Sequence, residues 1–337
     1  MKILVTGGAG YIGSTVCSAL EDNGHTPIVM DSLVRGRAEF TKGRIFYKAD
    51  VADKAALQKI LSEHPDIACT IHFAALIVVP ESVEKPYEYY TENVAKSLEL
   101  FRNLKDLGQS RIVFSSSASL YDIVPGFMVR ENSPLKPSSP YARTKYMMEM
   151  VLQDFCKAYN MRGIALRYFN PIGADPKLRT GPHDPSPSHV VGKMVDVALG
   201  KIPEFQITGV NWPTRDGSGI RDYIHVWDLA NAHIKAIENF DRSFDRAGNP
   251  DSNYLVINLG TGNGVTVKEL VAAFEKVQGK PLNKRETDPR PGDVAGAYAN
   301  ADTAKNLLGW EATLSIEQGI TDALRWGSHR KAILGYT

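Results

Sequence analysis

A tyrosine and a lysine four residues apart are the residues of this chain best suited to proton transfer. They are Tyr141 and Lys145, in the run YARTK that follows Ser139 and Pro140. On a helix, residues i and i+4 share a face, so the phenol and the ammonium group can point at one ligand. A neighbouring cation favours phenolate and lowers a tyrosine pKa from its usual ~10, which makes a general base for an alcohol. The motif alone also fits a surface Tyr and Lys on an amphipathic helix.

A serine cluster precedes that motif. The run SSSAS at residues 115–119 ends an apolar segment, and Ser115 and Ser117 fall where a strand would stop. Hydroxyl groups at a strand end can hydrogen-bond a sugar hydroxyl. A serine-rich turn that caps the next element is the alternative for the cluster taken alone.

A glycine-rich run near the N-terminus predicts a phosphate cradle. Gly7, Gly10 and Gly13 follow the apolar residues 3–5 with the spacing G-x-x-G-x-x-G. A strand, a glycine turn and the N-terminus of a helix together bind a pyrophosphate. A second apolar segment ends at Asp31, whose carboxylate can accept hydrogen bonds from the adenosine ribose. Because that carboxylate repels a 2′-phosphate, we expect NAD. The nearby Arg35 and Arg37 leave NADP as an alternative.

Alternating apolar and helical segments must position these residues. We expect strands at 2–6, 27–31, 44–48, 68–73, 111–115 and 163–168, and helices at 11–23, 53–63, 87–107 and 141–160. Repeated strand–helix units predict an α/β fold, a Rossmann-type doubly wound parallel sheet with a smaller mixed α/β substrate-binding domain. Ligands then bind at the carboxyl ends of the strands, where Gly7, Asp31, Asp50, residues 73–75 and residues 115–117 fall.

The second half of the chain has a less regular pattern. We expect helices at 188–200, 226–240, 266–278 and 316–330, and short strands near 204–208 and 255–259 that extend the sheet. Residues 1–170 are predicted to form an NAD-binding domain and residues 171–337 a substrate-binding domain. The chain is expected to cross between them, for example by returning to the first domain over 226–260.

Composition excludes several classes of function. The 337 residues carry 39 basic and 38 acidic side chains, a net charge of +1, so neither nucleic acid nor a membrane surface is an expected partner. No apolar run is long enough for a membrane span or a signal peptide. Cys17, Cys69 and Cys156 are few and odd in number, which favours reduced thiols in the cytoplasm. Metal-ligand spacing is absent, so no metal is expected.

The order of these motifs resembles the extended short-chain dehydrogenase/reductase family, and within it the UDP-glucose 4-epimerases. The resemblance covers nearly the whole chain. It rests on residues 6–13, 72–75, 81–86, 114–121, 140–145, 167–171, 216–225 and 289–293. The long motifs are more specific than the glycines alone.

The resemblance implies an isomerase that oxidises C4 of a nucleotide-sugar with bound NAD⁺ and reduces it again on the other face. Tyr141 takes the proton from the 4-hydroxyl, Lys145 binds the nicotinamide ribose, and Ser117 hydrogen-bonds the 4-oxygen. The implied cofactor residues are Gly7, Gly10, Tyr11, Ile12, Asp31, Ser32, Asp50, Val51, Phe73, Ala74, Ala75, Asn93, Ser115, Tyr141, Lys145 and Tyr168. The implied substrate residues are Ser117, Tyr141, Asn170, His189, Val190, Gln206, Arg221, Arg290, Asp293 and Ala297. A homodimer is also implied, formed by the helices at 87–107 and 141–160.

Several positions depart from the family pattern. Ile77 replaces a lysine near the cofactor ribose, His189 and Val190 replace an Asn-Leu pair, and Thr208 replaces an aromatic residue beside uracil. Ala297 aligns with a position where small residues admit N-acetyl groups. The sugar therefore stays open among hexoses, their N-acetyl forms, pentoses and uronates.

Two other readings remain. A nucleotide-sugar dehydratase would need an Asp-Glu pair where this chain has Ala118 and Ser119, and a decarboxylase of the same superfamily is a related possibility. A catalytically silent NAD-binding sensor would keep the glycines, but it would not need Tyr141, Lys145 and Ser117 together.

Overall fold

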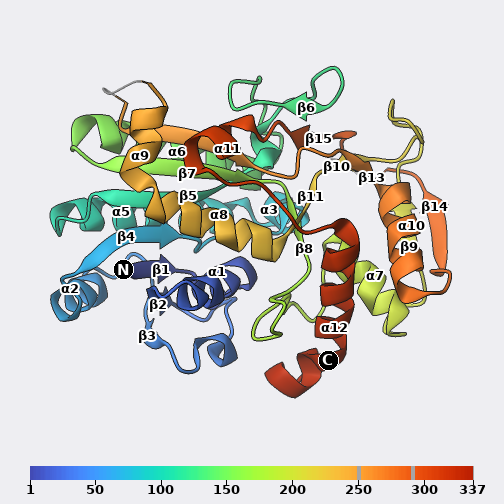
Figure 1. The fold of residues 1–337 in the computed structure, drawn as a ribbon, viewed down its shortest axis with the longest axis horizontal. Helices are drawn as coiled ribbons and strands as arrows, with labels where there is room; N and C mark the ends of the chain where they lie inside the picture. The colour runs from blue at the N-terminus through green and yellow to red at the C-terminus, as the bar shows by residue number, and fades with distance from the viewer. Residues whose placement is uncertain (249–251, 290–292, 337) are drawn as a thin grey trace.

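A seven-stranded parallel sheet forms the centre of the structure (Figure 1). The computed structural model describes residues 1–248, 252–289 and 293–336. From one edge to the other the strands are β3 (Ile45–Lys48), β2 (Thr26–Asp31), β1 (Lys2–Thr6), β4 (Ile67–His72), β5 (Arg111–Ser117), β7 (Arg162–Tyr168) and β12 (Tyr254–Leu259). The order reverses between β1 and β4, which is the switch point where doubly wound sheets bind ligands.

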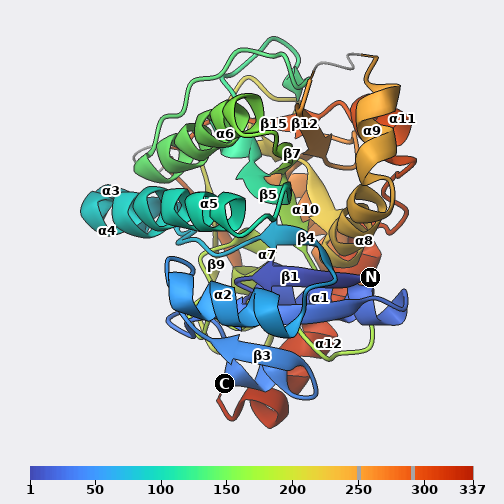
Figure 2. The ribbon, with the colours of Figure 1, turned by 90° about the vertical axis from the view of Figure 1, so that its left-hand side faces the viewer.

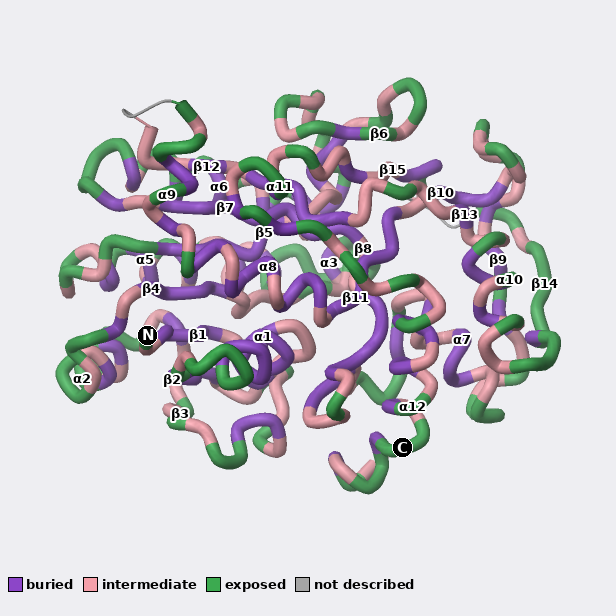
Figure 3. Tube along the Cα trace, viewed as in Figure 1, coloured by how far each residue is buried: buried purple, intermediate pink, exposed green. Residues whose placement is uncertain are grey.

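Helices cover both faces of this sheet (Figure 2). One face carries α1 (Tyr11–Asp22), α8 (Val226–Glu238), α9 (Phe240–Arg246) and α11 (Asp302–Leu308). The other carries α2 (Lys54–Glu63), α5 (Lys96–Asp106) and α6 (Pro140–Ala158). In β1, Ile3 and Val5 join the first core and Leu4 joins the second, as the two-residue period of a strand requires. Purple, buried segments therefore follow the central strands in Figure 3.

The predicted helix at 87–107 is interrupted. The chain forms α3 (Val79–Glu84), α4 (Pro86–Tyr90), a π-helical turn (Thr91–Ala95) and then α5. Pro86 begins α4, in a position where its missing N–H costs nothing. The π turn places Asn93 in the interior. Such turns insert one residue into a helix and are often found at functional sites.

A smaller α/β region packs beyond the carboxyl edge of the sheet around its own core, which includes Met194, Phe205 and Phe274. It contains β8 (Asn170–Ile172), α7 (Val190–Ala198), β9 (Phe205–Thr208), β10 (Ile220–Arg221), β11 (Tyr223–His225), β13 (Val265–Thr266), α10 (Val267–Gln278), β14 (Lys284–Thr287), β15 (Gly296–Ala299) and α12 (Ile316–Leu334). A short strand, β6 (Met128–Val129), pairs with β15.

The two strands expected to extend the sheet behave differently. β12 pairs with β7 along its full length and does extend it. The expectation for 204–208 is wrong, because β9 pairs with β14 in a separate two-stranded sheet. The partner β14 lies some 80 residues later, and nothing local in the sequence specifies that pairing. The division of the chain into two domains at residue 170 stays a prediction.

No helix in the part of the chain that the structure describes is long and apolar enough to cross a membrane.

Candidate active site

A cavity of about 1040 Å³ lies between the carboxyl edge of the large sheet and the smaller region. Most of the residues singled out from the sequence line it. The cofactor set contributes Gly7, Gly10, Tyr11, Ile12, Asp31, Ser32, Asp50, Val51, Phe73, Ala74, Ala75 and Ser115. The substrate set contributes Asn170, His189, Val190, Gln206, Arg221 and Asp293. One cavity therefore joins the two sets.

The glycine turn after β1 has room for a phosphate group but not for side chains. A Cβ on Gly7, whose φ is +73°, would lie 2.5 Å from the backbone nitrogen of Ala74. A Cβ on Gly13 would lie 2.3 Å from the carbonyl oxygen of Gly7. Gly10 precedes α1 and provides no side-chain cap, so the first N–H groups of the helix can bind an anion. The residues present thus fit the diphosphate of a dinucleotide.

Asp31 is fixed at the end of β2 by backbone donors. Its two carboxylate oxygens accept the N–H of Ala9 at 3.0 Å and of Leu33 at 2.8 Å. Burial raises the pKa of Asp31, and these two N–H groups oppose that shift. The arginines that could have bound a 2′-phosphate have other contacts. Arg35 pairs with Glu81 at 2.6 Å, and the Arg37 guanidinium lies over the Tyr336 ring. This arrangement favours NAD over NADP.

Lys96 and Glu92 are cavity residues that the sequence reasoning missed. The Lys96 ammonium lies 2.6 Å from Asp50 and 2.7 Å from Glu92. The i,i+4 spacing of Glu92 and Lys96 was visible as a helical ion pair. Asp50 lies 46 residues from Lys96 in the sequence, so only the fold could show that it is the second ion-pair partner of Lys96. This ion pair orients the Asp50 carboxylate at the cavity wall.

Tyr141, Lys145 and Ser117 come together beside the cavity. Ser139 caps α6 by accepting the Ala142 N–H at 3.1 Å, and Pro140 begins the helix, so Tyr141 lies in the first turn and Lys145 in the next. Lys145 is 3% exposed and donates to the Ser115 carbonyl at 2.7 Å. Ser117 is close enough to the Tyr141 phenol to lower its pKa.

Burial decides the direction of both pKa shifts in this cluster. It lowers the pKa of Lys145 to about 7, against a smaller opposing effect of Glu149. It raises the pKa of Tyr141, and Ser117 only partly offsets the rise. The expectation of a lowered tyrosine pKa is therefore wrong, because the free energy lost by withdrawing the phenolate from water exceeds the stabilisation that the Ser117 hydrogen bond provides.

Six of the expected site residues do not line the cavity as the described residues define it: Ser117, Tyr141, Lys145, Asn93, Tyr168 and Ala297. Asn93 makes two hydrogen bonds to the Leu76 backbone, at 2.7 and 2.9 Å, and donates to Thr144 at 3.1 Å. It thus ties the segment after β4 to α6. Tyr168 and His233 hydrogen-bond at 2.5 Å behind the wall. Ala297 packs in a small core beside Tyr121 and Phe169.

The substrate set is spread over loops and short elements. His189 caps α7 by accepting the Gly192 N–H at 3.1 Å, and burial lowers its pKa to about 4, so the ring is neutral. Arg221 donates to the carbonyls of Val294 and Ala295 at 3.1 and 2.8 Å. Its guanidinium is therefore held against the backbone of residues 294–295. Arg290 lies outside the described residues.

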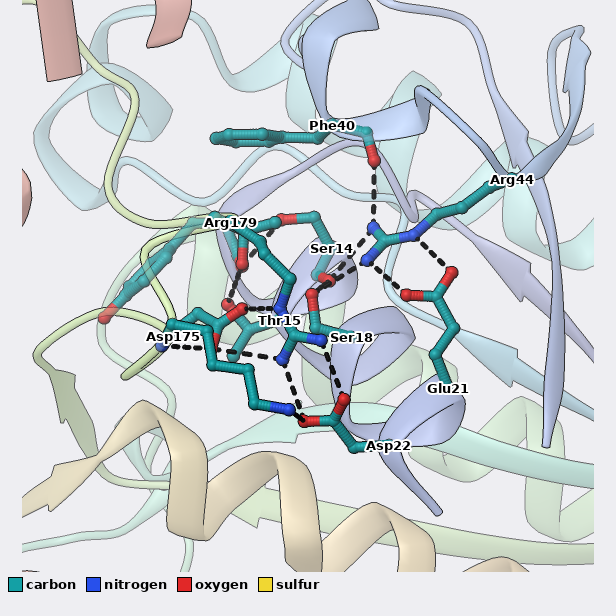
Figure 4. Close-up of polar contacts among 12 residues, drawn as sticks. Ser14, Thr15, Ser18, Glu21, Asp22, Phe40, Arg44, Asp175 and Arg179 are labelled. Atoms are coloured by element: carbon teal, nitrogen blue, oxygen red, sulfur yellow. Dashed lines mark hydrogen bonds and ion pairs between the residues drawn. The ribbon is translucent and has the colours of Figure 1, made fainter. Parts of the chain in front are cut away.

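The segment from 173 to 189 joins β8 to α7 and contacts α1 on the way. Arg179 contacts both carboxylate oxygens of Asp22 on α1, at 2.8 and 3.0 Å, and is itself held by the buried Asp175 (Figure 4). Thr180 and Thr15 hydrogen-bond at 3.0 Å. Gly10 and Tyr11, at the start of α1, line the cofactor end of the cavity. The same helix therefore supports both ends of the cavity.

Comparisons with known proteins agree with this arrangement. The family model described as "NAD dependent epimerase/dehydratase family" matches residues 3–251. A UDP-glucose 4-epimerase from Bacillus subtilis is 42% identical, with 97% of each chain covered. A structure of UDP-glucose-4-epimerase from Stenotrophomonas maltophila, with bound NAD and formylated UDP-arabinopyranose, has a TM-score of 0.92 at 35% identity, covering 98% of this chain and 99% of that one.

A second structure is that of UDP-glucose 4-epimerase from Bifidobacterium longum in complex with NAD+ and UDP. It has a TM-score of 0.89 at 34% identity, and all of both chains is covered. Sequence, fold and cavity point the same way, and the chain belongs to the NAD dependent epimerase/dehydratase family.

Proposed function

We propose that this protein is a nucleotide-sugar 4-epimerase that uses NAD to interconvert UDP-glucose and UDP-galactose. The observation that supports the proposal is that the glycine cradle and the Tyr141–Lys145 pair lie at the same edge of the large sheet. The glycine cradle at β1 opens into the same cavity as Ser115, and the carbonyl of Ser115 accepts a hydrogen bond from Lys145 of the Tyr141–Lys145 pair.

The proton chemistry belongs to α6 and β5. Tyr141 takes the proton from the sugar 4-hydroxyl and later returns it, so its phenol alternates between base and acid. Ser117 hydrogen-bonds the 4-oxygen from β5. The protonated form of Lys145, on the same face of α6, would stabilise the phenolate. Bound NAD⁺ would supply the redox chemistry by accepting a hydride from C4 and returning it to the other face.

The cofactor would be held at the first end of the cavity. Gly7, Gly10 and the first N–H groups of α1 would bind the pyrophosphate. The fixed Asp31 carboxylate would bind the adenosine ribose, and Asp50 the adenine end. Because a redox-neutral cycle regenerates NAD⁺, we expect the cofactor to stay bound during purification.

The nucleotide-sugar would lie along the second end. The planar guanidinium of Arg221 suits a diphosphate, since its fork can donate two hydrogen bonds. The N-terminus of α7 at His189 and Val190 adds backbone donors. We place Asn170, Gln206, Arg290 and Asp293 among the contacts to the sugar and the nucleoside.

N-acetylated UDP-sugars are a second candidate substrate class. Ala297 does not line the cavity itself, but its backbone pairs in register with that of Arg221, the proposed diphosphate contact, across β15 and β10. Turnover of UDP-N-acetylglucosamine by the protein, reduced by Ala297→Tyr more than turnover of UDP-galactose, would establish it. An equal loss for the two substrates would exclude Ala297 as the gate.

We also propose a homodimer in the cytoplasm. The outer surface of α3 to α6 exposes Val83, Tyr87, Leu98, Met147 and Met150, more apolar area than helices that only cover a sheet require. The three cysteines are buried free thiols, as in reducing compartments. A monomeric mass by light scattering at micromolar concentration would contradict the dimer.

The function is tested by incubating the purified protein with UDP-galactose and separating the nucleotide-sugars by chromatography. Conversion to UDP-glucose without net NADH formation is the expected result. The supernatant of the denatured protein should contain NAD in near-stoichiometric amount. Net NADH accumulation, or no conversion of any UDP-sugar, would contradict the proposal and favour a dehydrogenase or a sensor.

A further inference from the structure

Glu149 lies on the same face of α6 as the proposed catalytic pair, one turn beyond Lys145. Tyr141, Lys145 and Glu149 follow each other at intervals of four residues, which aligns them in one stripe. Glu149 is 4% exposed. A carboxylate is rarely so deeply buried unless other groups satisfy it. The proposed chemistry uses the first two residues of the stripe and leaves the third without a role.

Three strong donors satisfy this carboxylate. Arg167 of β7 binds it with two parallel hydrogen bonds, from Nε at 2.9 Å and from Nη2 at 2.7 Å. The Ser116 hydroxyl of β5 donates to the same carboxylate. Arg167 is in turn held by the Tyr121 hydroxyl at 2.9 Å and the Glu131 carbonyl at 3.1 Å. The carboxylate therefore fastens α6 to two neighbouring strands.

The attachment points lie directly beside the proposed catalytic groups. Ser116 lies between Ser115 and Ser117. The Ser115 carbonyl accepts a hydrogen bond from the Lys145 ammonium, and Ser117 faces the Tyr141 phenol. A slip of α6 along β5 would break the Glu149 contact and both of these contacts together. The register of helix on strand thus determines where the phenol meets Ser117.

We propose that Glu149 is a positioning residue of this active site. It fixes the register of α6 on β5 and β7, and it places a negative charge one helical turn from Lys145. The inference rests on the proposed function only where it assigns a purpose to the Lys145 charge.

The charges around Lys145 support this assignment. Glu149 is the charged group that raises the pKa of Lys145, against the larger lowering by burial. His72 of β4 is neutral, since burial and Lys145 lower its pKa to about 3. Around Glu149 and Arg167 of β7 lie Tyr121, Glu131 beside Tyr121, and Tyr254 of β12 with Cys156 of α6 beside it. Tyr168 of β7 lies near Tyr141.

The test is a direct titration of Lys145 in the purified protein with its bound cofactor. Lysine labelled with ¹³C at the ε position gives one resonance that Lys145→Met removes, and its midpoint is followed by NMR. Glu149→Gln removes the negative charge that lies about one helical turn from the Lys145 ammonium. It should lower the Lys145 midpoint by about one pH unit or more, because water screens such a charge little in the interior. The basic limb of the kcat profile should move in the same direction.

Two variants separate charge from fit. Glu149→Asp keeps the charge and shortens the reach, so it should leave the Lys145 midpoint nearly unchanged while lowering kcat. Ser116→Ala removes the strand contact and should behave likewise. If Glu149→Gln fails to fold because Arg167 is left unpaired, Glu149→Gln with Arg167→Gln removes both charges and should still lower the midpoint, by less than Glu149→Gln because the more distant positive charge is lost as well.

An unmoved midpoint in a folded Glu149→Gln protein would overturn the inference and leave Glu149 a packing residue. That outcome is distinct from failure of the proposed function, in which the unsubstituted protein converts no nucleotide-sugar whatever the Lys145 midpoint.

Discussion

The cofactor end of the cavity is lined mainly by residues at strand ends between 7 and 96, and by Ser115. The substrate end, by contrast, is lined by loops and short elements spread over residues 170–294. At the cofactor end, backbone atoms make the shape, as where Ala74 leaves no space for a Cβ on Gly7. At the substrate end, side chains make it, and Arg221 is held by the carbonyls of a distant segment.

This difference teaches which parts of the site are rigid and which depend on tertiary contacts. A backbone cradle is fixed once β1 and β4 pair. A guanidinium held by loop carbonyls is fixed only when the smaller region has folded against the sheet. Substitutions at the two ends should therefore fail in different ways.

The largest effect is expected between the two ends, at the proposed base. Tyr141→Phe removes one oxygen and keeps the ring, so kcat should fall at least ~10²–10⁴-fold, the usual contribution of a general base. Bound NAD and calorimetric UDP affinity should stay near their original values. Near-normal turnover would overturn the mechanism.

At the cofactor end, Gly7→Ala should cost both stability and bound NAD. The new Cβ would meet the Ala74 backbone at 2.5 Å in addition to the strain of a φ of +73°. Gly24→Ala is a matched control, since Gly24 has the same φ and nothing within 4 Å. The control should lose only the strain cost of about 1–2 kcal/mol. Equal thermal shifts and equal NAD contents in the two variants would contradict the cradle.

At the substrate end, Arg221→Gln should weaken nucleotide-sugar binding and leave the cofactor in place. Hydrogen bonds from a charged group contribute about 1.5–3 kcal/mol, so KM should rise about ten-fold or more. Arg221→Lys keeps the charge without the planar fork and should give an intermediate KM. Loss of NAD from Arg221→Gln would show that the two ends are not separable.

The smallest effect is expected where the segment from 173 to 189 is fastened to α1. Hydrogen bonding by Arg179 lowers the pKa of Asp22, so the pair stabilises the fold above the unfolded-state pKa and loses this effect as pH falls through the folded-state pKa. Asp22→Asn should cost about 1 kcal/mol of unfolding free energy at pH 7, and the difference should vanish in acid. Asp66→Asn, which removes an exposed pair with Lys2, should change stability less. A pH-independent difference would contradict the assignment.

Local patterns gave the strands and most of the helices because those depend on residues close in sequence. The runs that end at Thr6, Asp31 and His72 are apolar and β-branched enough to predict buried parallel strands. Helix α3 and the π turn around Asn93 escaped prediction. The π turn was missed because the residues on either side of it continue a helical pattern. The partner of β9 escaped it because parallel pairing with β14 joins distant segments.

The sequence by itself determined the fold class, the glycine cradle, Asp31 at its strand end and the shared face of Tyr141 and Lys145, because each follows from spacing within a few turns of chain. The tertiary structure alone decided the direction of the Tyr141 pKa shift, the satisfied burial of Glu149 by Arg167 and the carbonyl contacts of Arg221. Those features depend on desolvation and on partners from other elements. Both arise only when the chain packs, and no local pattern encodes them.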